Sequence, residues 1–327
     1  MKNTTRGLVL LLAAGVLAAG QAPALDSNAR KAIVDEIGRL MDEKYVFPDI
    51  GKKCGAHLQA KLAAGAFEKA AAAESLASLL TEELQSIAHD RHLRVSAPGI
   101  RGAGFPPSPA KDLPVPFTGQ LFELEHGFRR VGILPGNIGY LDLLGFVSEA
   151  VGRDMAVAAM KFLGGVDAII VDLRDNGGGS PELIRLISSY FFDRPTHLNS
   201  LYWRAGNRTQ EFWTYEKVDG PRLAEVPIFV LTSRRTASGG EEFAYNLKTR
   251  QRALIIGETT WGGANPGGTH PLSAGLRIFI PAGRAINPIT QTNWEGTGVA
   301  PDVPADRDKA FDIAFEKAKA AAEARRR

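Results

Sequence analysis

The sequence contains only one cysteine, Cys54, among its 327 residues. No internal disulfide can form, so a buried core must hold the fold together. Cys54 has apolar neighbours at helical spacing, Leu58 and Leu62. This spacing favours a buried structural thiol over a nucleophile.

A strong excess of charge of either sign is also lacking. Lys and Arg total 39 and Asp and Glu total 36, a formal net charge of +3. Two of the basic residues, Lys2 and Arg6, lie at the amino terminus, and no basic run lies inside the chain. The balance argues against a role driven by charge on nucleic acid or on a membrane surface, and favours a small molecule or peptide as partner.

Motifs for metal, nucleotide or flavin binding are missing, so no cofactor and no metal are predicted. Glycine is abundant, with 35 residues, and it is clustered along the chain. The cluster at 177–179 lacks the Lys-Ser/Thr ending of a phosphate loop and the spaced glycines of a dinucleotide fingerprint. Such clusters mark backbone that turns sharply or approaches a ligand closely.

The first 24 residues have the pattern of a cleaved secretory signal. Lys2 and Arg6 precede an apolar stretch at residues 8–19, which ends in the small-x-small sequence Ala22-Pro23-Ala24. An uncleaved anchor helix requires about 20 consecutive apolar residues, more than this run provides. We therefore predict cleavage after Ala24, a periplasmic or secreted mature chain, and no membrane attachment after cleavage.

Hydrophobic periodicity divides the remaining chain into a helical part and a part in which strands alternate with helices. Strand runs without polar alternation, separated by helices, indicate a mostly parallel sheet covered on both faces. The expected order is a signal peptide at 1–24, a helical domain at 25–96 ending in a strand with His92, a proline-rich linker at 97–125, an α/β core at 126–307 and a final helix at 308–327.

Ser238 carries the strongest local signal for chemistry. It lies in Thr-Ala-Ser-Gly-Gly-Glu-Glu-Phe, where a strand ends and a helix begins. The helix amino terminus stabilises developing negative charge, and the N–H of Gly239 is the natural first oxyanion donor. Ser238 and Glu241 also fit a capping box, so the motif alone favours a nucleophile and an N-cap equally, and the two roles are compatible.

A second cluster, Asp-Leu-Arg-Asp-Asn-Gly-Gly-Gly-Ser-Pro at residues 172–181, again joins a strand to a helix. Its three glycines allow a ligand to reach the backbone, and such a turn can bind an anion. Taken alone, the cluster is more typical of an ordinary tight turn between a strand and a helix.

Together these motifs resemble the carboxyl-terminal processing (tail-specific) serine peptidases, in the branch of interphotoreceptor retinoid-binding protein and the tricorn core peptidase. The resemblance covers nearly the whole mature chain. The matching segments, in order, are 45–48, 90–93, 138–141, 172–179, 238–243, 257–264 and 293–302.

The resemblance implies a ClpP/crotonase-like α/β core preceded by a small helical domain, with Ser238 as nucleophile. The lysine that acts as general base in the processing branch would fall at Gly263. In the tricorn-like branch a histidine and a late glutamate serve instead, and these match His92 and Glu295. Imidazole oriented by a carboxylate is a suitable base for a serine hydroxyl near neutral pH.

Alternatives to these roles remain open. His92 as a lone histidine is also typical of a surface or packing residue, and Glu295 of a solvated loop carboxylate. His89, three residues earlier, is expected only to favour a helix end. The resemblance places the second oxyanion donor at Gly178, with the adjacent glycines 177 and 179 as alternatives.

The proline-rich linker is too short to hold the PDZ domain that processing peptidases usually carry. Substrate selection would then depend on the helical domain and the core cleft. The predicted function is a secreted or periplasmic serine peptidase that cleaves peptides or unfolded chains through an acyl-enzyme on Ser238. The main alternative is a non-catalytic carrier of apolar ligands on the same fold, and a crotonase-like acyl-CoA enzyme is supported only by fold analogy.

Overall fold

A computed structural model describes residues 25–70, 72–99, 113–121 and 127–327. The predicted signal peptide and most of the predicted linker therefore lie outside the described residues. Among the described residues, no helix has both the length and the apolar character needed to cross a membrane.

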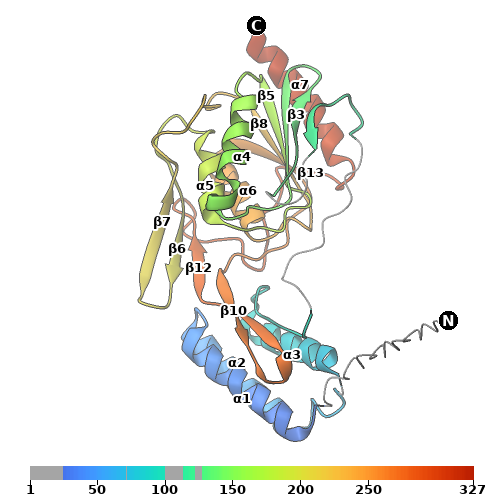
Figure 1. Ribbon diagram of the computed structural model, residues 1–327, viewed down its shortest axis with the longest axis vertical. Helices are drawn as coiled ribbons and strands as arrows, with labels where there is room; N and C mark the ends of the chain where they lie inside the picture. Colours follow the sequence, from blue (N-terminus) through green and yellow to red (C-terminus); the bar gives the residue numbers. More distant parts are fainter. Residues whose placement is uncertain (1–24, 71, 100–112, 122–126) are drawn as a thin grey trace, which may run out of the picture.

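The amino-terminal part contains three helices that pack together (Figure 1): α1 (Ser27–Lys44), α2 (Pro48–Ala63) and α3 (Ala73–Ala88). Asp26 caps α1 by accepting the N–H of Ala29 at 2.7 Å, and Pro48 opens α2, where its missing N–H costs nothing. The apolar side chains that repeat at helical spacing form one buried cluster with Cys54.

A segment from late in the sequence completes this helical part. Strand β1 (Arg94–Ser96) pairs antiparallel with β11 (Arg277–Pro281), and β11 pairs antiparallel with β10 (Gly267–Pro271). A 3₁₀ turn, η2 (Ser273–Gly275), joins β10 to β11. Ile278 and Ile280 of β11 are buried in the helical cluster. The amino-terminal part is therefore built from two segments that lie far apart in the sequence.

A seven-stranded sheet forms the centre of the second part, in the order β13-β9-β8-β5-β4-β3-β2. Five of its strands run parallel, and β3 and β2 add an antiparallel edge. The strands are β2 (Thr118–Leu121), β3 (Phe128–Leu134), β4 (Ile138–Leu143), β5 (Ala168–Asp172), β8 (Ile228–Thr232), β9 (Ala253–Gly257) and β13 (Val303–Pro304).

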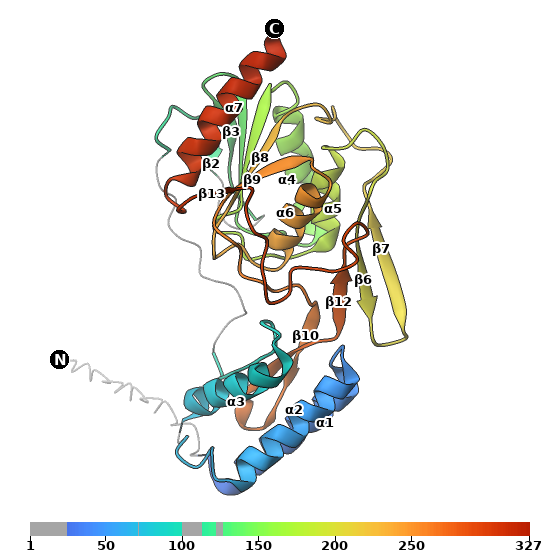
Figure 2. The ribbon, with the colours of Figure 1, turned by 180° about the vertical axis from the view of Figure 1, so that it is seen from behind.

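Helices cover both faces of this sheet (Figure 2). On one face lie α4 (Glu149–Phe162), α5 (Pro181–Ser189) and α6 (Gly239–Thr249), and on the other lies α7 (Ala310–Arg326). Alternate residues of β5 serve the two layers: Ile169 packs in the first cluster and Ile170 in the α7 cluster. The predicted α/β core with a helical region before it is confirmed.

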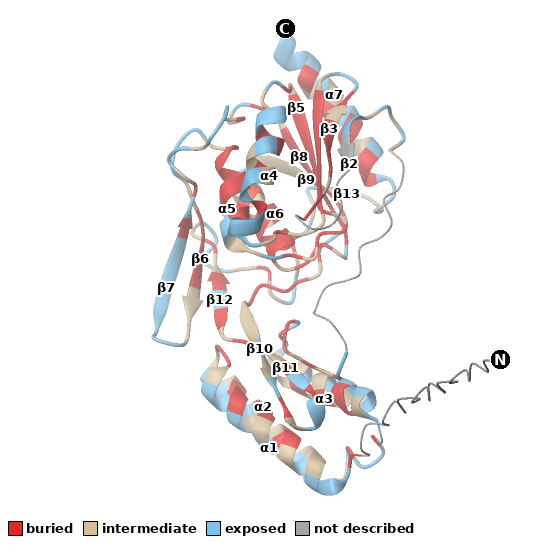
Figure 3. Cartoon of the chain, in the orientation of Figure 1, coloured by how far each residue is buried: buried red, intermediate tan, exposed pale blue. Residues whose placement is uncertain are grey.

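A third, three-stranded sheet has the order β12-β6-β7, made of β12 (Gly283–Ile286), β6 (His197–Trp203) and β7 (Arg208–Trp213). Most of β7 is exposed, in contrast to the buried strands of the central sheet (Figure 3). The hairpin of β6 and β7 was not predicted from the sequence.

The expected strand at His92 begins later than predicted. His92 lies in a bend, and the strand starts at Arg94. This bend leaves the His92 side chain free of the alternation that a strand imposes, and it allows the ring to face the core.

Candidate active site

The site forms where the carboxyl ends of neighbouring parallel strands meet. The loops that follow β5, β8 and β9 all leave the same edge of the sheet, because these strands are parallel and adjacent. They carry, in order, the glycine cluster, Ser238 and the segment around Gly263.

Ser238 lies at the N-cap of α6, with φ at +54° and ψ at −118°. A residue with a Cβ atom rarely adopts this conformation, which costs about 1–3 kcal/mol and is typical of functional turns. A Cβ atom placed on Gly178 would lie 2.7 Å from the Cβ of Ser238, so the glycine cluster touches the serine.

Glu241 ties the serine turn to the loop after β9. Its buried carboxylate accepts the N–H of Ser238 at 2.8 Å, the hydroxyl of Thr260 at 2.6 Å and the N–H of Gly263 at 2.9 Å, and also the N–H of Gly262. Burial raises the pKa of Glu241 to about 7, and these hydrogen bonds oppose the rise. The predicted capping box is present, and the same carboxylate also binds Thr260, Gly262 and Gly263, which no sequence pattern linked to it.

Two backbone N–H groups beside Ser238 are unused. The N–H of Gly239 and that of Gly179 donate to no acceptor among the described residues. They lie close together, because a Cβ on Gly239 would be 2.8 Å from the nitrogen of Gly179. In contrast, Gly178 donates its N–H to Oδ1 of Asn176 at 2.9 Å, and Gly177 donates to the carbonyl of Leu144 at 3.0 Å.

His92 packs its ring between Trp261, in the loop after β9, and Phe279 of β11. The residue is 6% exposed, and its ring lies edge-on to Trp261 at 5.1 Å and tilted against Phe279 at 5.8 Å between centroids. Nδ1 is buried and has no hydrogen-bond partner among the described residues. Burial lowers the pKa of His92 to about 4, and Arg94 adds to this effect, so the ring is neutral at pH 7.

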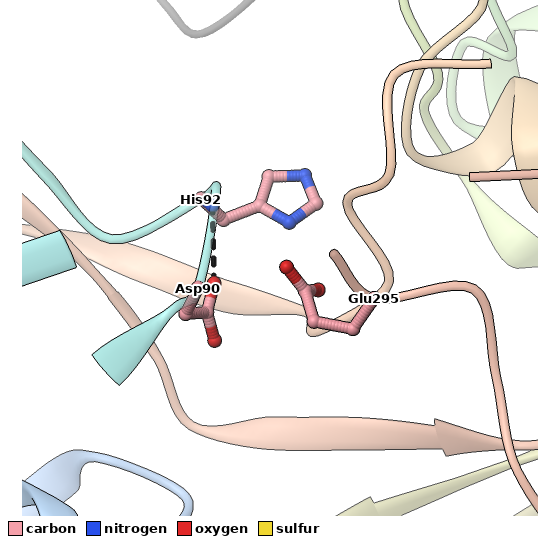
Figure 4. Close-up of side chains that lie close together, drawn as sticks. All are labelled: Asp90, His92 and Glu295. Atoms are coloured by element: carbon pink, nitrogen blue, oxygen red, sulfur yellow. Dashed lines mark hydrogen bonds between the residues drawn. The ribbon is translucent and has the colours of Figure 1, made fainter. Parts of the chain in front are cut away.

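Two carboxyl groups, those of Asp90 and Glu295, lie beside this ring. The ligating atoms of Asp90, His92 and Glu295 are all within 4.8 Å of one another. Figure 4 shows the ring nitrogen next to Cγ, Nδ1, facing the Glu295 carboxylate, with Nε2 directed away from both acids. Burial raises the pKa of Glu295, and the backbone N–H groups that it binds oppose this.

Gly263 connects His92 to the serine turn. A Cβ atom on Gly263 would lie 2.7 Å from Cε1 of His92. The N–H of Gly263 and the N–H of Ser238 bind the same oxygen, Oε2 of Glu241, at 2.9 and 2.8 Å. The ring of His92 thus occupies the space in front of Gly263, on the side where a side chain at that position would project.

Of the residues expected at the site, Ser238, Gly239 and Gly178 lie in contact, and His92 lies with Glu295. No hydrogen bond joins Ser238 to His92 in the described part of the chain. His89 is the αL C-cap of α3, with φ at +52°, and stands outside the His92 cluster. Asp90 was not among the residues expected at the site, although its position two residues before His92 allows its carboxylate to accept the His92 N–H, as it does at 3.1 Å.

Asp90, His92 and Glu295 are also the one group among the described residues whose ligating atoms are close enough to surround a metal ion. The donor set does not require one, because all four carboxylate oxygens already accept hydrogen bonds from N–H or O–H groups. The donors are Tyr45, Arg91, His92, Ala264 and Asn265.

The α/β core carries a strained serine turn at the carboxyl edge of its sheet. Comparison with known proteins identifies the family to which this core belongs. Residues 137–305 match the model of peptidase family S41. Residues 19–119 match the N-terminal domain of peptidase S41 in eukaryotic IRBP. The chain belongs to peptidase family S41, and the resemblance inferred from its motifs is confirmed.

Curated relatives include carboxyl-terminal-processing peptidase 2 of Arabidopsis thaliana, which is 32% identical over 180 residues, 52% of this chain and 33% of the relative. The carboxyl-terminal-processing protease of a Picosynechococcus species is 30% identical over 38% of this chain and 29% of its own length. This chain therefore spans about a third of the length of these curated relatives.

Solved structures share the fold at lower identity. A putative peptidase from Parabacteroides merdae has a TM-score of 0.65 at 19% identity, over 89% of this chain and 96% of its own. The tricorn protease has a TM-score of 0.54 at 14% identity, over 92% of this chain and 37% of its own.

Proposed function

We propose that the protein is a serine peptidase that cleaves peptides or unfolded protein chains through an acyl-enzyme on Ser238, with His92 as general base and Glu295 as the group that orients it. The observation that carries this proposal is the contact between the His92 ring and Gly263, whose N–H shares one oxygen of Glu241 with the N–H of Ser238.

Acylation begins when the hydroxyl oxygen of Ser238 attacks the carbonyl carbon of the scissile peptide bond. The hydroxyl proton passes to Nε2 of His92, which is neutral at pH 7 and can accept it. The resulting imidazolium carries a proton on Nδ1 as well, and this N–H faces the Glu295 carboxylate. The leaving amine then takes the proton from Nε2, and the acyl group remains on Ser238.

The tetrahedral intermediate places a negative charge on the former carbonyl oxygen. Gly239 and Gly179 are the donors proposed to stabilise it, because both N–H groups are unused and lie beside Ser238. The N–H of Gly178, the donor expected from the sequence, is held by Asn176 in this structure. Gly178 then contributes by allowing the loop to touch the serine.

Deacylation repeats these steps with water as nucleophile. His92 takes a proton from water through Nε2, hydroxide adds to the acyl carbon, and the ester bond to Ser238 breaks as the proton returns to the serine oxygen. The products are a free carboxyl group on one fragment and a regenerated enzyme.

Extended protein chains are the substrate class proposed here. Relatives are named for carboxyl-terminal processing, and no PDZ domain is present among the described residues, where only two short strands lie between α3 and β3. Selection of substrate then falls to the helical part and the core. The amino-terminal signal pattern supports action in the periplasm or outside the cell.

Reaction with a fluorophosphonate probe, followed by peptide mapping, tests the proposal. The protein should be labelled on Ser238, and Ser238→Ala should abolish both labelling and peptidase activity. Lys248→Ala is the control, because Lys248 lies near the far end of α6 and pairs with Asp302 at 2.7 Å. Label elsewhere, or label that survives Ser238→Ala, would overturn the assignment.

A folded protein that takes no label would instead favour the carrier of apolar ligands. Extraction of the purified protein with organic solvent would then be expected to release a bound lipid. His92→Ala should remove most activity with little change in melting temperature, whereas a large fall in that temperature would indicate a packing role for the ring.

A further inference from the structure

Asp90 ties the backbone of His92 to two other segments of the chain. Its carboxyl group is buried, with 1% of the residue exposed. Oδ1 accepts the N–H of His92 at 3.1 Å, and Oδ2 accepts the hydroxyl of Tyr45 at 3.2 Å and the side-chain amide of Asn265 at 2.8 Å. One carboxylate thus joins the end of α1, the segment that carries His92 and the loop after β9.

Glu295 is held in a parallel manner. Oε1 accepts the N–H of Arg91 at 3.0 Å, and Oε2 accepts the N–H of Ala264 at 2.6 Å and that of Asn265 at 3.1 Å. Asn265 therefore donates to both acids, one through its backbone and one through its side chain. The two carboxyl groups thus bind the N–H groups of Arg91 and His92, and Asn265 links one carboxyl group to the other.

We propose that Asp90 is a positioning residue for this reaction, and that it forms with Glu295 a carboxyl pair that carries one negative charge at neutral pH and holds the His92 ring with Nδ1 toward Glu295. The proposal rests on the proposed function of His92 as general base.

The charge follows from the distances and the burial. Two carboxylates within 4.8 Å in a buried setting repel each other strongly, so one of them retains a proton near neutral pH. The other titratable or charged groups near the pair are Tyr45, Arg91, His92 and, across the cavity that both acids line, Arg284; Arg94 acts on His92. Burial raises the pKa of Asp90 to about 7, and Glu295 adds to this rise.

Asp90 and Glu295 can exchange protons with solvent by a route that does not pass Ser238. Both acids line a cavity of about 410 Å³ together with Tyr45 and Asn265. Asp90 also lines a second cavity, of about 390 Å³, with His89 and Trp261. The charge state of the pair therefore follows the pH of the surrounding solution.

The test replaces Asp90 in the full chain and follows the imidazole of His92 by NMR, with its resonances assigned from a His92→Asn variant. Asp90→Asn leaves the charge on Glu295 and removes the carboxyl group that titrates near pH 7, so the His92 resonances should lose the chemical-shift step that this group causes near that pH. The same step should disappear from the pH profile of kcat/KM, and kcat should fall about 10-fold or more while KM stays within about twofold.

Tyr45→Phe is the matched control, because it removes one hydrogen bond to Asp90 and no negative charge. Its His92 titration should match that of the unaltered protein. The proposal would be overturned if the His92 titration changed equally in both variants. It would also be overturned if folded Asp90→Asn kept both the His92 titration and the kcat of the unaltered protein. If Asp90→Asn fails to fold, Glu295→Gln replaces it: the Asp90 carboxyl should then titrate at lower pH, and an unchanged titration overturns the pair.

The NMR measurement does not depend on catalysis. If Ser238 takes no label and no peptide is cleaved, the proposed function fails, and the titration still reports whether the two acids act together on His92.

Discussion

Cε1 of His92 lies 2.7 Å from the place that a Cβ atom on Gly263 would take, and the ring of Trp261 lies 2.4 Å from it. Gly263 is held on both sides, because its N–H binds Glu241 and its carbonyl accepts the indole N–H of Trp294 at 2.9 Å. The ring of His92 in its present position therefore leaves no space for a side chain at position 263.

Gly263→Ala should displace the His92 ring and lower kcat/KM by about 100-fold, since a misplacement near 1 Å in an active site has an effect of this size. The measurement is hydrolysis of a fluorogenic peptide and the rate of fluorophosphonate labelling. Gly268→Ala is the control, because a Cβ there would meet only His270 Nε2, at 3.9 Å. Equal activity of the two variants would show that His92 is not held by this contact.

Gly178→Ala should abolish activity in a protein that still contains Ser238. Gly178 has φ at +99°, and its added Cβ would lie 2.7 Å from the Cβ of Ser238 and 2.8 Å from the nitrogen of Gly239. Gly206→Ala separates backbone strain from this clash, because Gly206 has φ at +75° and open space around it. That control should lose about 1 kcal/mol of unfolding free energy and retain full activity. Activity that survives in Gly178→Ala would contradict the contact.

Glu241→Gln should lower both stability and activity. The carboxylate accepts a hydroxyl and three N–H groups, and an amide in its place would turn an NH₂ group toward some of these donors. Leaving buried donors without acceptors costs about 1–3 kcal/mol. Urea unfolding should detect this loss, and fluorophosphonate labelling of Ser238 should slow. A variant as stable as the unaltered protein would mean that the hydrogen bonds are replaced by solvent.

The long buried strands and the amphipathic helices of the core were predictable, because periodicity reports which side of an element is buried. The cluster at 172–181 joins a buried strand, β5, to a helix, α5, as its sequence predicted. The position of Ser238 at a strand-to-helix turn, with Glu241 as its capping partner, was also predictable from neighbouring residues. These features depend on residues a few positions apart.

Features that join distant segments were not predictable from the pattern. The pairing of β1 with β11 joins residues near 95 to residues near 278, and no local signal specifies it. The same holds for the bond from Arg91 N–H to Glu295 and for the bridge that Asn265 makes to Asp90. The resemblance to a family predicted that His92 and Glu295 act at one site. The role proposed for Asp90 could be inferred only from the positions of these three residues in the structure.

The last prediction concerns Glu242, which is 6% exposed on α6 next to Glu241. Burial raises the pKa of Glu242 to about 7 from an ordinary 4.5; Asn199 and Asn246 oppose the rise, and Glu182 adds to it. Because the folded state binds this proton more tightly than the unfolded chain, Glu242 destabilises the fold progressively as pH rises from about 4.5 to 7. Glu242→Gln removes the charge but keeps the shape.

The free energy of unfolding of Glu242→Gln should therefore match that of the unaltered protein near pH 4.5 and exceed it at pH 8 by roughly 1–3 kcal/mol. Urea unfolding of both proteins across this range measures the difference. Glu216→Gln, at an exposed position, should give a difference that does not change with pH. The opposite result would be a Glu242→Gln variant that loses stability, relative to the unaltered protein, as pH rises from 4.5 to 8. The buried carboxylate would then be ionised and stabilised by its amide neighbours, and the assigned direction of its pKa shift would be wrong.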